Sequence, residues 1–149
     1  LGNPILSDDS VGIKVARELI SLRITQRSLR DVHIAEVYAG GIRLMDEMVG
    51  YDRAVIIDAM VTQDNMPGTI RSFSLSDLIS TRNMVCAHDM NLPTALEMGK
   101  TLGLRLPSDI RILGIEAADV ENFGEELTEE VKKAVPVVVE KVVQELTRG

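Results

Sequence analysis

The apolar run at residues 54–57, which Asp58 follows directly, constrains the fold more than any other feature of this chain. A strand that is apolar at every position is typical of the centre of a parallel sheet, where helices cover both faces. Parallel neighbours are joined by long crossover connections, which are usually helical. The run therefore indicates an α/β protein with helices on both sides of its sheet.

The remaining segments fit this class. The helical spacing of apolar residues predicts helices at residues 11–22, 42–49, 92–102 and 128–146. Alternating or β-branched residues predict further strands at residues 32–38, 69–75 and 109–115. The strand at residues 69–75 is expected to be an edge or antiparallel strand. We expect one domain over residues 1–149, a three-layer α/β/α sandwich around a mostly parallel central sheet of about five strands. The chain opens in the middle of a strand-to-helix corner, so we also expect the first strand of this domain to be truncated at the N-terminus.

Acidic residues stand at two predicted strand exits. The opening segment LGNPILSDDSVG places Asp8 and Asp9 just before the first helix, where one carboxylate is enough to cap it. Asp58 follows the buried run, and burial of a carboxylate is unfavourable unless it is paired, hydrogen-bonded or bound to a metal. A helix cap and a loop cap are the structural alternatives for these aspartates.

Histidine supplies a third candidate ligand. His88 follows the apolar segment at residues 83–87, and the carboxyl ends of parallel strands meet at the edge of an α/β sheet where ligands bind. We therefore expect Asp9, Asp58 and His88 to meet at one edge, and two carboxylates with an imidazole suit a divalent transition metal. His33, the other histidine, lies in a predicted strand and is expected to have no catalytic role.

Composition excludes several other classes of protein. The net charge is −7 and Lys and Arg form no dense cluster, which argues against nucleic acid as the main partner. No apolar run approaches the ~18–20 residues of a membrane span. Cys86 is the only cysteine, so an intramolecular disulfide and a multi-cysteine zinc site are excluded, and a reducing cytoplasm is the expected location.

The order of several segments resembles the hydrogenase maturation endopeptidases. The matching segments are GNPILSDDSVG, YAGG, VIIDAMV with NMPGT, and HDMNLPTALE, and the match extends from the first residues to about Gly114. The resemblance implies a protease that removes a C-terminal extension from the large-subunit precursor of nickel–iron hydrogenases after nickel insertion. It also implies that the enzyme has no metal cofactor of its own and recognises nickel already held by the precursor.

The resemblance assigns site residues as well. It implies that Asp9, Asp58 and His88 are the catalytic and nickel-binding groups, with Asp9 standing where the family often has glutamate. Gly40 and Gly41 match the family's glycine turn, where the substrate backbone is expected to approach closely. Whether the metal or a carboxylate activates the attacking water stays open.

Two rival functions also stay open. The same three side chains would serve a non-catalytic nickel-binding chaperone, and α/β/α domains of this kind carry other hydrolase activities. A dinucleotide-binding module is disfavoured because the opening turn lacks G-x-G-x-x-G spacing. We further expect some of Met60, Met66 and Met90 to border the substrate groove, with the filling of core gaps as the alternative.

Overall fold

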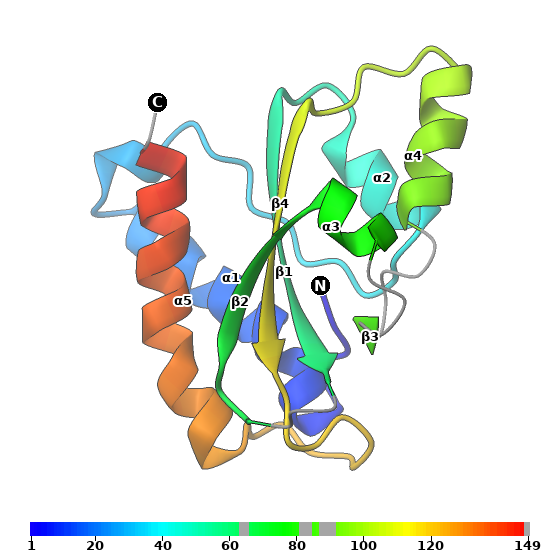
Figure 1. The fold of residues 1–149 in the computed structure, drawn as a ribbon. Coiled ribbons are helices and arrows are strands. Elements are labelled where there is room, and N and C mark those ends of the chain that lie inside the picture. The colour runs from blue at the N-terminus through cyan, green and yellow to red at the C-terminus, as the bar shows by residue number, and fades with distance from the viewer. Residues whose placement is uncertain (63–65, 81–84, 87–91, 148–149) are drawn as a thin grey trace.

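The computed structural model describes residues 1–62, 66–80, 85–86 and 92–147. In chain order its elements are the 3-10 helix η1 (Ser7–Ser10), α1 (Val11–Arg23), the 3-10 helix η2 (Arg27–Leu29), α2 (Ile42–Met48), β1 (Arg53–Val61), β2 (Ile70–Ser74), α3 (Leu75–Ser80), β3 (Val85–Cys86), α4 (Leu92–Thr101), β4 (Asp109–Glu116) and α5 (Glu129–Thr147). Helices and strands are interspersed along the chain, which confirms the predicted α/β class (Figure 1).

Two parallel strands, β1 and β4, form the centre of the sheet. The strand order is β2-β4-β1-β3, and β1 lies parallel to β4 from Arg53 opposite Asp109 to Met60 opposite Glu116. Both outer strands, β2 and β3, run antiparallel to their neighbours. The described sheet is therefore mixed and not mostly parallel. The expectation that residues 69–75 form an edge or antiparallel strand is confirmed by β2. The connection from β1 to β2, at residues 62–69, is too short for the crossover that a parallel pair requires.

Helices cover both faces of this sheet (Figure 1). One apolar cluster joins α1 and α5 to the face that carries Ile57 and Leu113, and a second joins α2 and α4 to the face that carries Ile56 and Ile112. Successive side chains point to opposite faces of a strand, so the unbroken apolar run of β1 contributes to both clusters. The described elements thus form the three layers that this run predicted.

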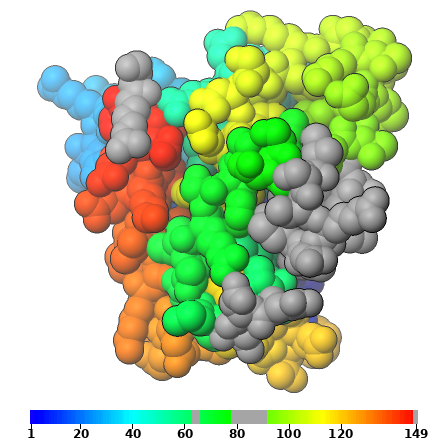
Figure 2. Space-filling model, in the orientation of Figure 1, coloured from blue at the N-terminus to red at the C-terminus, as the bar shows by residue number. Residues whose placement is uncertain are grey.

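One face of the molecule has β2 and α3 at its middle, between α5 on one side and α4 on the other (Figure 2). β2 is an edge strand of the described sheet. No helix within the described part of the chain is long and apolar enough to cross a lipid bilayer.

The contact between α1 and β1 is close because of Gly12. A Cβ atom at this position would lie 2.4 Å from the carbonyl oxygens of both Ile57 and Leu1. Helix α1 therefore begins directly against the backbone of β1. The preceding turn, η1, contacts the same strand.

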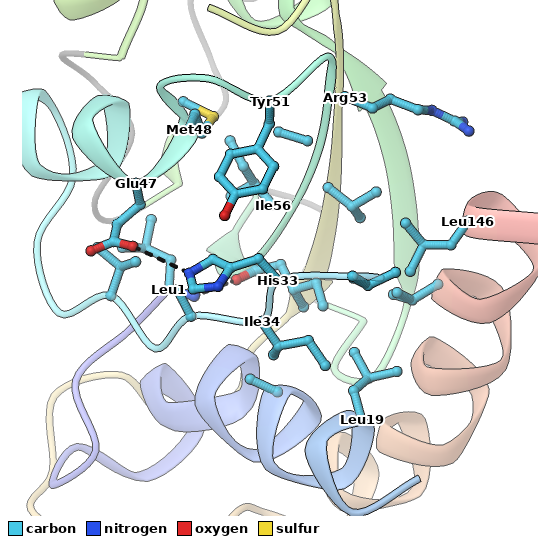
Figure 3. Close-up of a pocket in the computed structure, with 18 of the residues that line it drawn as sticks. Leu1, Leu19, His33, Ile34, Glu47, Met48, Tyr51, Arg53, Ile56 and Leu146 are labelled. Carbon is cyan, nitrogen blue, oxygen red and sulfur yellow. Dashed lines mark hydrogen bonds and ion pairs between the residues drawn. The ribbon is translucent and has the colours of Figure 1, made fainter. Parts of the chain in front are cut away.

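Residues 32–38 form no strand, and that prediction is wrong. The carbonyl of Val37 accepts a hydrogen bond from the N–H of Gly2 at 3.1 Å, but the segment makes no continuous ladder with a described strand. A strand needs neighbours for stability, and on this side the described residues pair with β1 only at Met60 and Val61, through β3. A cavity of about 390 Å³ is bordered by this segment and by β1 (Figure 3).

Candidate active site

Asp58 lies inside β1 and not after it, which corrects the predicted end of the strand. β1 continues beyond it because Ala59 and Met60 still pair with β4. Asp58 is fully buried, and its Oδ1 accepts a hydrogen bond from the N–H of Ala59 at 3.0 Å. It shares a face of the strand with Ile56, so the carboxylate is held on the side of the sheet that α2 and α4 cover.

Asp9 is a second buried carboxylate near the end of β1. Its side chain is 2% exposed, and its Oδ2 accepts a hydrogen bond from the backbone N–H of Asn3 at 2.9 Å. Gly2 makes this turn possible, because its φ is +146° and a Cβ atom there would lie 2.1 Å from the carbonyl oxygen of Asp9. The Gly-Asn-Pro turn therefore folds tightly back onto η1 and orients Asp9.

The N-terminal turn connects the two aspartates. The amino group of Leu1 donates a hydrogen bond at 2.8 Å to the carbonyl of Ile57, the residue directly before Asp58. Two residues later, the N–H of Asn3 donates to Asp9. The structure thus places Asp9 and Asp58 on elements that meet at the carboxyl end of β1 (Figure 1).

The role of Asp8 is structural and differs from that of its neighbour Asp9. Its Oδ2 accepts hydrogen bonds from the N–H of Ala118 at 2.9 Å and of Asp119 at 3.0 Å. Its Oδ1 accepts one from the N–H of Thr128 at 2.8 Å, and the Thr128 hydroxyl also donates to this carboxylate. Asp8 therefore ties η1 to the loop after β4 and to the start of α5. The N-cap of α1 is Ser10, whose side chain makes no capping hydrogen bond, and the Asp8 carboxylate is bonded to other segments.

The loop at residues 117–128 is held in shape by its own side chains. The carboxylate of Asp119 accepts hydrogen bonds from the N–H of Asn122 at 3.0 Å, from the Asn122 side-chain amide at 3.0 Å and from the N–H of Glu121 at 3.1 Å. These bonds, those from Asn122 first, lower the pKa of Asp119 below its ordinary value. The loop therefore offers Asp8 a defined set of backbone donors.

Glu116, the last residue of β4, is a further buried carboxylate that was not predicted. It is 1% exposed, its Oε1 accepts a hydrogen bond from the N–H of Thr62 at 2.6 Å, and its Oε2 accepts one from the Thr62 hydroxyl at 3.0 Å. Its carbonyl accepts from the N–H of Gly68 and its N–H donates to the carbonyl of Thr69, both at 2.8 Å. Glu116 thus fixes both ends of the connection after β1. The signal was present in the sequence, because Glu116 ends an apolar strand as an acidic residue, as Asp58 was expected to do.

The glycine turn lies where the N-terminal turn meets the segment before α2. Gly41 precedes the first residue of α2 with φ +62° and ψ −129°, a conformation that favours glycine, and its carbonyl accepts the N–H of Met45 at 3.0 Å. Gly40 stands directly before it. The bond between Gly2 and Val37 places this part of the chain beside the N-terminal turn that orients Asp9.

For Met60 the core-filling alternative holds, and the groove prediction is not tested for Met66 and Met90. Met60 lies in β1 and is 1% exposed, and its Sδ is 2.7 Å from the place that a Cβ of Gly114 would take. It therefore fills the core and borders no groove. Met66 is 67% exposed, whereas Met90 lies outside the described residues.

Neither Asp9 nor Asp58 lines the cavity beside β1, so this cavity is separate from the two buried carboxylates. His33 borders it, stacked on Tyr51 with ring centroids 5.6 Å apart, and its Nε2 lies 3.7 Å from Oε2 of Glu47 (Figure 3). His33 therefore lies in a different environment from the two aspartates.

Asp9 and Asp58 are candidate metal ligands, as the sequence predicts. Carboxylate oxygens are suitable ligands for divalent metals, and an imidazole would complete a mixed oxygen and nitrogen set. Within the described ranges, no three His, Cys, Asp or Glu side chains cluster closely enough to hold an ion. The third expected ligand, His88, lies outside the described residues, so the complete ligand set stays a prediction.

Comparison with known families decides the class of this protein. The family model HycI, described as hydrogenase maturation protease, matches residues 13–145. The chain belongs to the hydrogenase maturation protease family. It is therefore a peptidase of this family. Asp58, Gly40, Gly41 and His88 lie within the matched residues, and Asp9 lies just before them.

Relatives of this protease agree in sequence and in fold. The Hydrogenase 2 maturation protease of Escherichia coli (strain K12) is 26% identical over 151 residues, which cover 98% of this chain and 87% of the relative. The solved NiFe hydrogenase maturation protease HybD from Thermococcus kodakarensis is 28% identical with a TM-score of 0.79, over 98% of this chain and 95% of that one. The hydrogenase maturating endopeptidase HybD from E. coli shares the fold, with a TM-score of 0.80 and 24% identity over 97% of this chain and 87% of that one.

Proposed function

We propose that this hydrogenase maturation protease removes a C-terminal extension from the large-subunit precursor of a nickel–iron hydrogenase after nickel has been inserted. Nickel is then part of the substrate, and the enzyme needs no metal cofactor of its own. Family membership supports the peptidase chemistry, and the name of the T. kodakarensis relative supports the class of hydrogenase. The single cysteine favours the cytoplasm as the place of action.

The observation that carries this proposal is the pair of carboxylates at the carboxyl end of β1. Asp9 is 2% exposed and Asp58 is fully buried, and each is oriented by a backbone N–H. Such fixed carboxylates favour a divalent cation, because a positive charge offsets the unfavourable burial of negative charge. The nickel of the precursor is a cation of this kind.

His88 is proposed as the third group that faces the nickel. With Asp9 and Asp58 it would supply two oxygen ligands and one nitrogen ligand, a set that suits nickel. Nickel held there would polarise the scissile carbonyl or activate a water molecule. In the alternative route, one of the carboxylates acts as general base and the nickel only positions the precursor. Under both routes a nickel-free precursor leaves the site incomplete, so cleavage depends on nickel.

Gly40 and Gly41 are proposed to border the path of the precursor's tail. A turn without Cβ atoms lets a second backbone approach closely, and the segment before α2 lies beside the N-terminal turn that orients Asp9. The tail would then pass between a glycine turn and the two carboxylates.

Incubation with nickel-loaded and nickel-free precursor, followed by mass measurement of the products, tests this function. We expect loss of a C-terminal peptide from the nickel-loaded precursor alone. The Asp58→Asn variant should abolish cleavage, although its side-chain oxygen still accepts the N–H of Ala59 and the fold is kept. Asp46→Asn changes an exposed carboxylate on α2 and is the matched control, which should cleave at the parent rate.

Other results would identify the rival functions. Nickel-dependent binding of the precursor without cleavage would show a chaperone, and hydrolysis of other substrates with no action on the precursor would show a different hydrolase. A folded Asp58→Asn protein that cleaves at the parent rate would remove Asp58 from the site.

A further inference from the structure

A large apolar side chain is exposed on the loop that follows β4. Phe123, in this loop at residues 117–128, is 82% exposed, and Ile5 of the N-terminal turn is 50% exposed. The two segments are in direct contact, because Leu6 and Phe123 form an antiparallel bridge and the N–H of Gly124 donates a hydrogen bond to the carbonyl of Ile5 at 2.9 Å. Two adjoining segments thus carry exposed apolar side chains, and exposed apolar surface of this kind often marks an interaction site.

The loop that carries Phe123 is braced at its base and near its tip. Asp8 accepts hydrogen bonds from the N–H groups of Asp119 and Thr128, close to the two ends of the loop. The Asp119 carboxylate accepts the N–H groups of Glu121 and Asn122, directly before Phe123. The aromatic side chain is therefore exposed on a well-fixed backbone. A side chain presented in this way loses little conformational freedom when a partner binds it.

The exposed pair lies beside the turn that orients Asp9. β4 is parallel to β1, so the loop that follows β4 begins at the carboxyl end of both strands (Figure 1). Within the N-terminal turn, the N–H of Ile5 donates to the side-chain oxygen of Asn3 at 3.2 Å, and the N–H of Asn3 donates to the Asp9 carboxylate. Phe123 and Asp9 are thus joined to the same short turn. A protein that binds at Asp9 would also meet this loop.

Charge restricts the kind of partner that suits the loop. Residues 117–128 include four acidic residues and no Lys or Arg. Glu121 and Glu125 are exposed and stand two residues before and after Phe123. This charge disfavours an anionic membrane surface, and it disfavours a second copy of a chain with net charge −7. The complementary surface is an apolar pocket of a protein, bordered by Lys or Arg side chains.

We propose that Ile5 and Phe123, flanked by Glu121 and Glu125, form a docking surface for the folded body of the large-subunit precursor. Phe123 would enter an apolar pocket of the precursor, since buried aromatic side chains commonly supply much of the binding energy of an interface. Docking there would hold the precursor while its tail reaches Asp9. The inference rests on the proposed function and adds to it a contact away from the nickel.

Cleavage kinetics of nickel-loaded precursor test this docking surface. We expect Phe123→Ala to raise KM by about tenfold or more and to leave kcat within about twofold of the parent value. Phe123→Leu should regain most of the loss, because an apolar side chain is kept. The bridge and the bond to Ile5 use backbone atoms, so both variants should melt within about 2 °C of the parent.

Ile24→Ala is the matched control. Ile24 is 84% exposed, as Phe123 nearly is, and it directly follows the 13 residues of α1. That length places it about 20 Å from the start of the helix, where η1 and Asp9 lie. Its KM and kcat should equal those of the parent.

Binding measurements separate docking from cleavage. In the Asp58→Asn background, calorimetry with nickel-loaded precursor should show that Phe123→Ala weakens affinity by about the same factor by which it raises KM. Glu121→Gln combined with Glu125→Gln should reduce the loss of affinity that added salt causes, because fewer charge pairs are then screened.

The outcomes distinguish this inference from the proposed function. Cleavage by the parent with unchanged KM and affinity in Phe123→Ala would overturn the docking surface alone. A loss confined to kcat would also overturn it, since the loop would then act by positioning Asp9. Binding of the precursor that depends on Phe123 but leads to no cleavage would support docking and refute the protease function. Absence of both binding and cleavage would refute both.

Two further results would assign the surface to another occupant and so overturn the proposal. One is a dimer of the parent that Phe123→Ala dissociates in analytical ultracentrifugation. The other is Phe123-dependent sedimentation with vesicles of phosphatidylcholine and phosphatidylglycerol.

Discussion

At the scale of single residues, Asp8 and Asp9 differ in what they bind. Asp8 accepts hydrogen bonds from three backbone N–H groups and one hydroxyl, whereas Asp9 accepts one from Asn3 across the N-terminal turn.

Both oxygens of Asp8 are acceptors, so an asparagine there would direct its amide N–H₂ at other donors. We expect Asp8→Asn to lower the free energy of unfolding by about 2–4 kcal/mol. Asp9→Asn, whose remaining oxygen still faces Asn3, should lower it by less than about 1 kcal/mol. Urea unfolding of the two variants measures both, and equal losses would show that Asp8 is not the structural residue of the pair.

Sequence reasoning at this scale succeeds where a residue is unusual in its local context. Asp58 could be singled out because a carboxylate beside a buried apolar run is unfavourable without a partner. The partners of Asp8 could not be predicted, since Ala118 and Thr128 are 110 and 120 residues away in the chain. Glu116 was missed because its strand was expected to end one residue earlier, so its burial was not considered.

At the scale of elements, the loop at residues 117–128 depends on ionised Asp119. Hydrogen bonds from Asn122 and Glu121 lower the pKa of Asp119 below its ordinary value of 3.8, so the folded protein favours its charged form. The contribution of the Asp119 carboxylate to stability is therefore complete above about pH 4 and is lost as the pH falls through the lower pKa of the folded state.

We expect Asp119→Ala to lower the melting temperature at pH 7 and to flatten the decline of the melting temperature below pH 4. Glu125→Gln, which changes an exposed carboxyl of the same loop, should leave that decline unchanged in thermal scans between pH 2.5 and 7. Identical acid limbs for Asp119→Ala and the parent would contradict this role.

Elements were predictable where one segment carries its own pattern, as in β1, β2, β4, α1, α2, α4 and α5, whereas α3 was not predicted. The segment at residues 32–38 has a strand pattern and yet forms no strand, because pairing depends on a neighbour that the pattern does not contain. β3 falls within the apolar segment at residues 83–87, whose end was expected to be a strand exit, and the described strand spans only Val85 and Cys86. The direction of β2 follows from the length of its connection to β1, which sequence spacing already contained.

At the scale of the whole molecule, the candidate site depends on segments near both ends of the chain. η1 carries Asp9 near residue 10, and the loop that fixes η1 lies more than a hundred residues later, so the site exists only in the folded domain.

The proposed ligands include no thiolate and should hold nickel or zinc only modestly by themselves. We expect protease treated with a chelator, and then freed of it, to cleave nickel-loaded precursor at the untreated rate. Activity that is lost and returns only when metal is added back to the protease would show that the enzyme has a catalytic ion of its own.

Gly12 has a consequence for attempts to make this protein more heat-resistant. A glycine inside a helix is a standard target for replacement, because alanine favours the helix by roughly 0.8–1.0 kcal/mol. Here the added methyl group would lie 2.4 Å from two carbonyl oxygens of the backbone, and the helix would have to move away from the strand that carries Asp58. We expect Gly12→Ala to lower the melting temperature by several degrees. Gly99→Ala in α4 should be milder, because its new methyl meets the flexible end of Met45. A protein engineer who ranks helix positions by propensity would thus choose first the position where replacement does most harm.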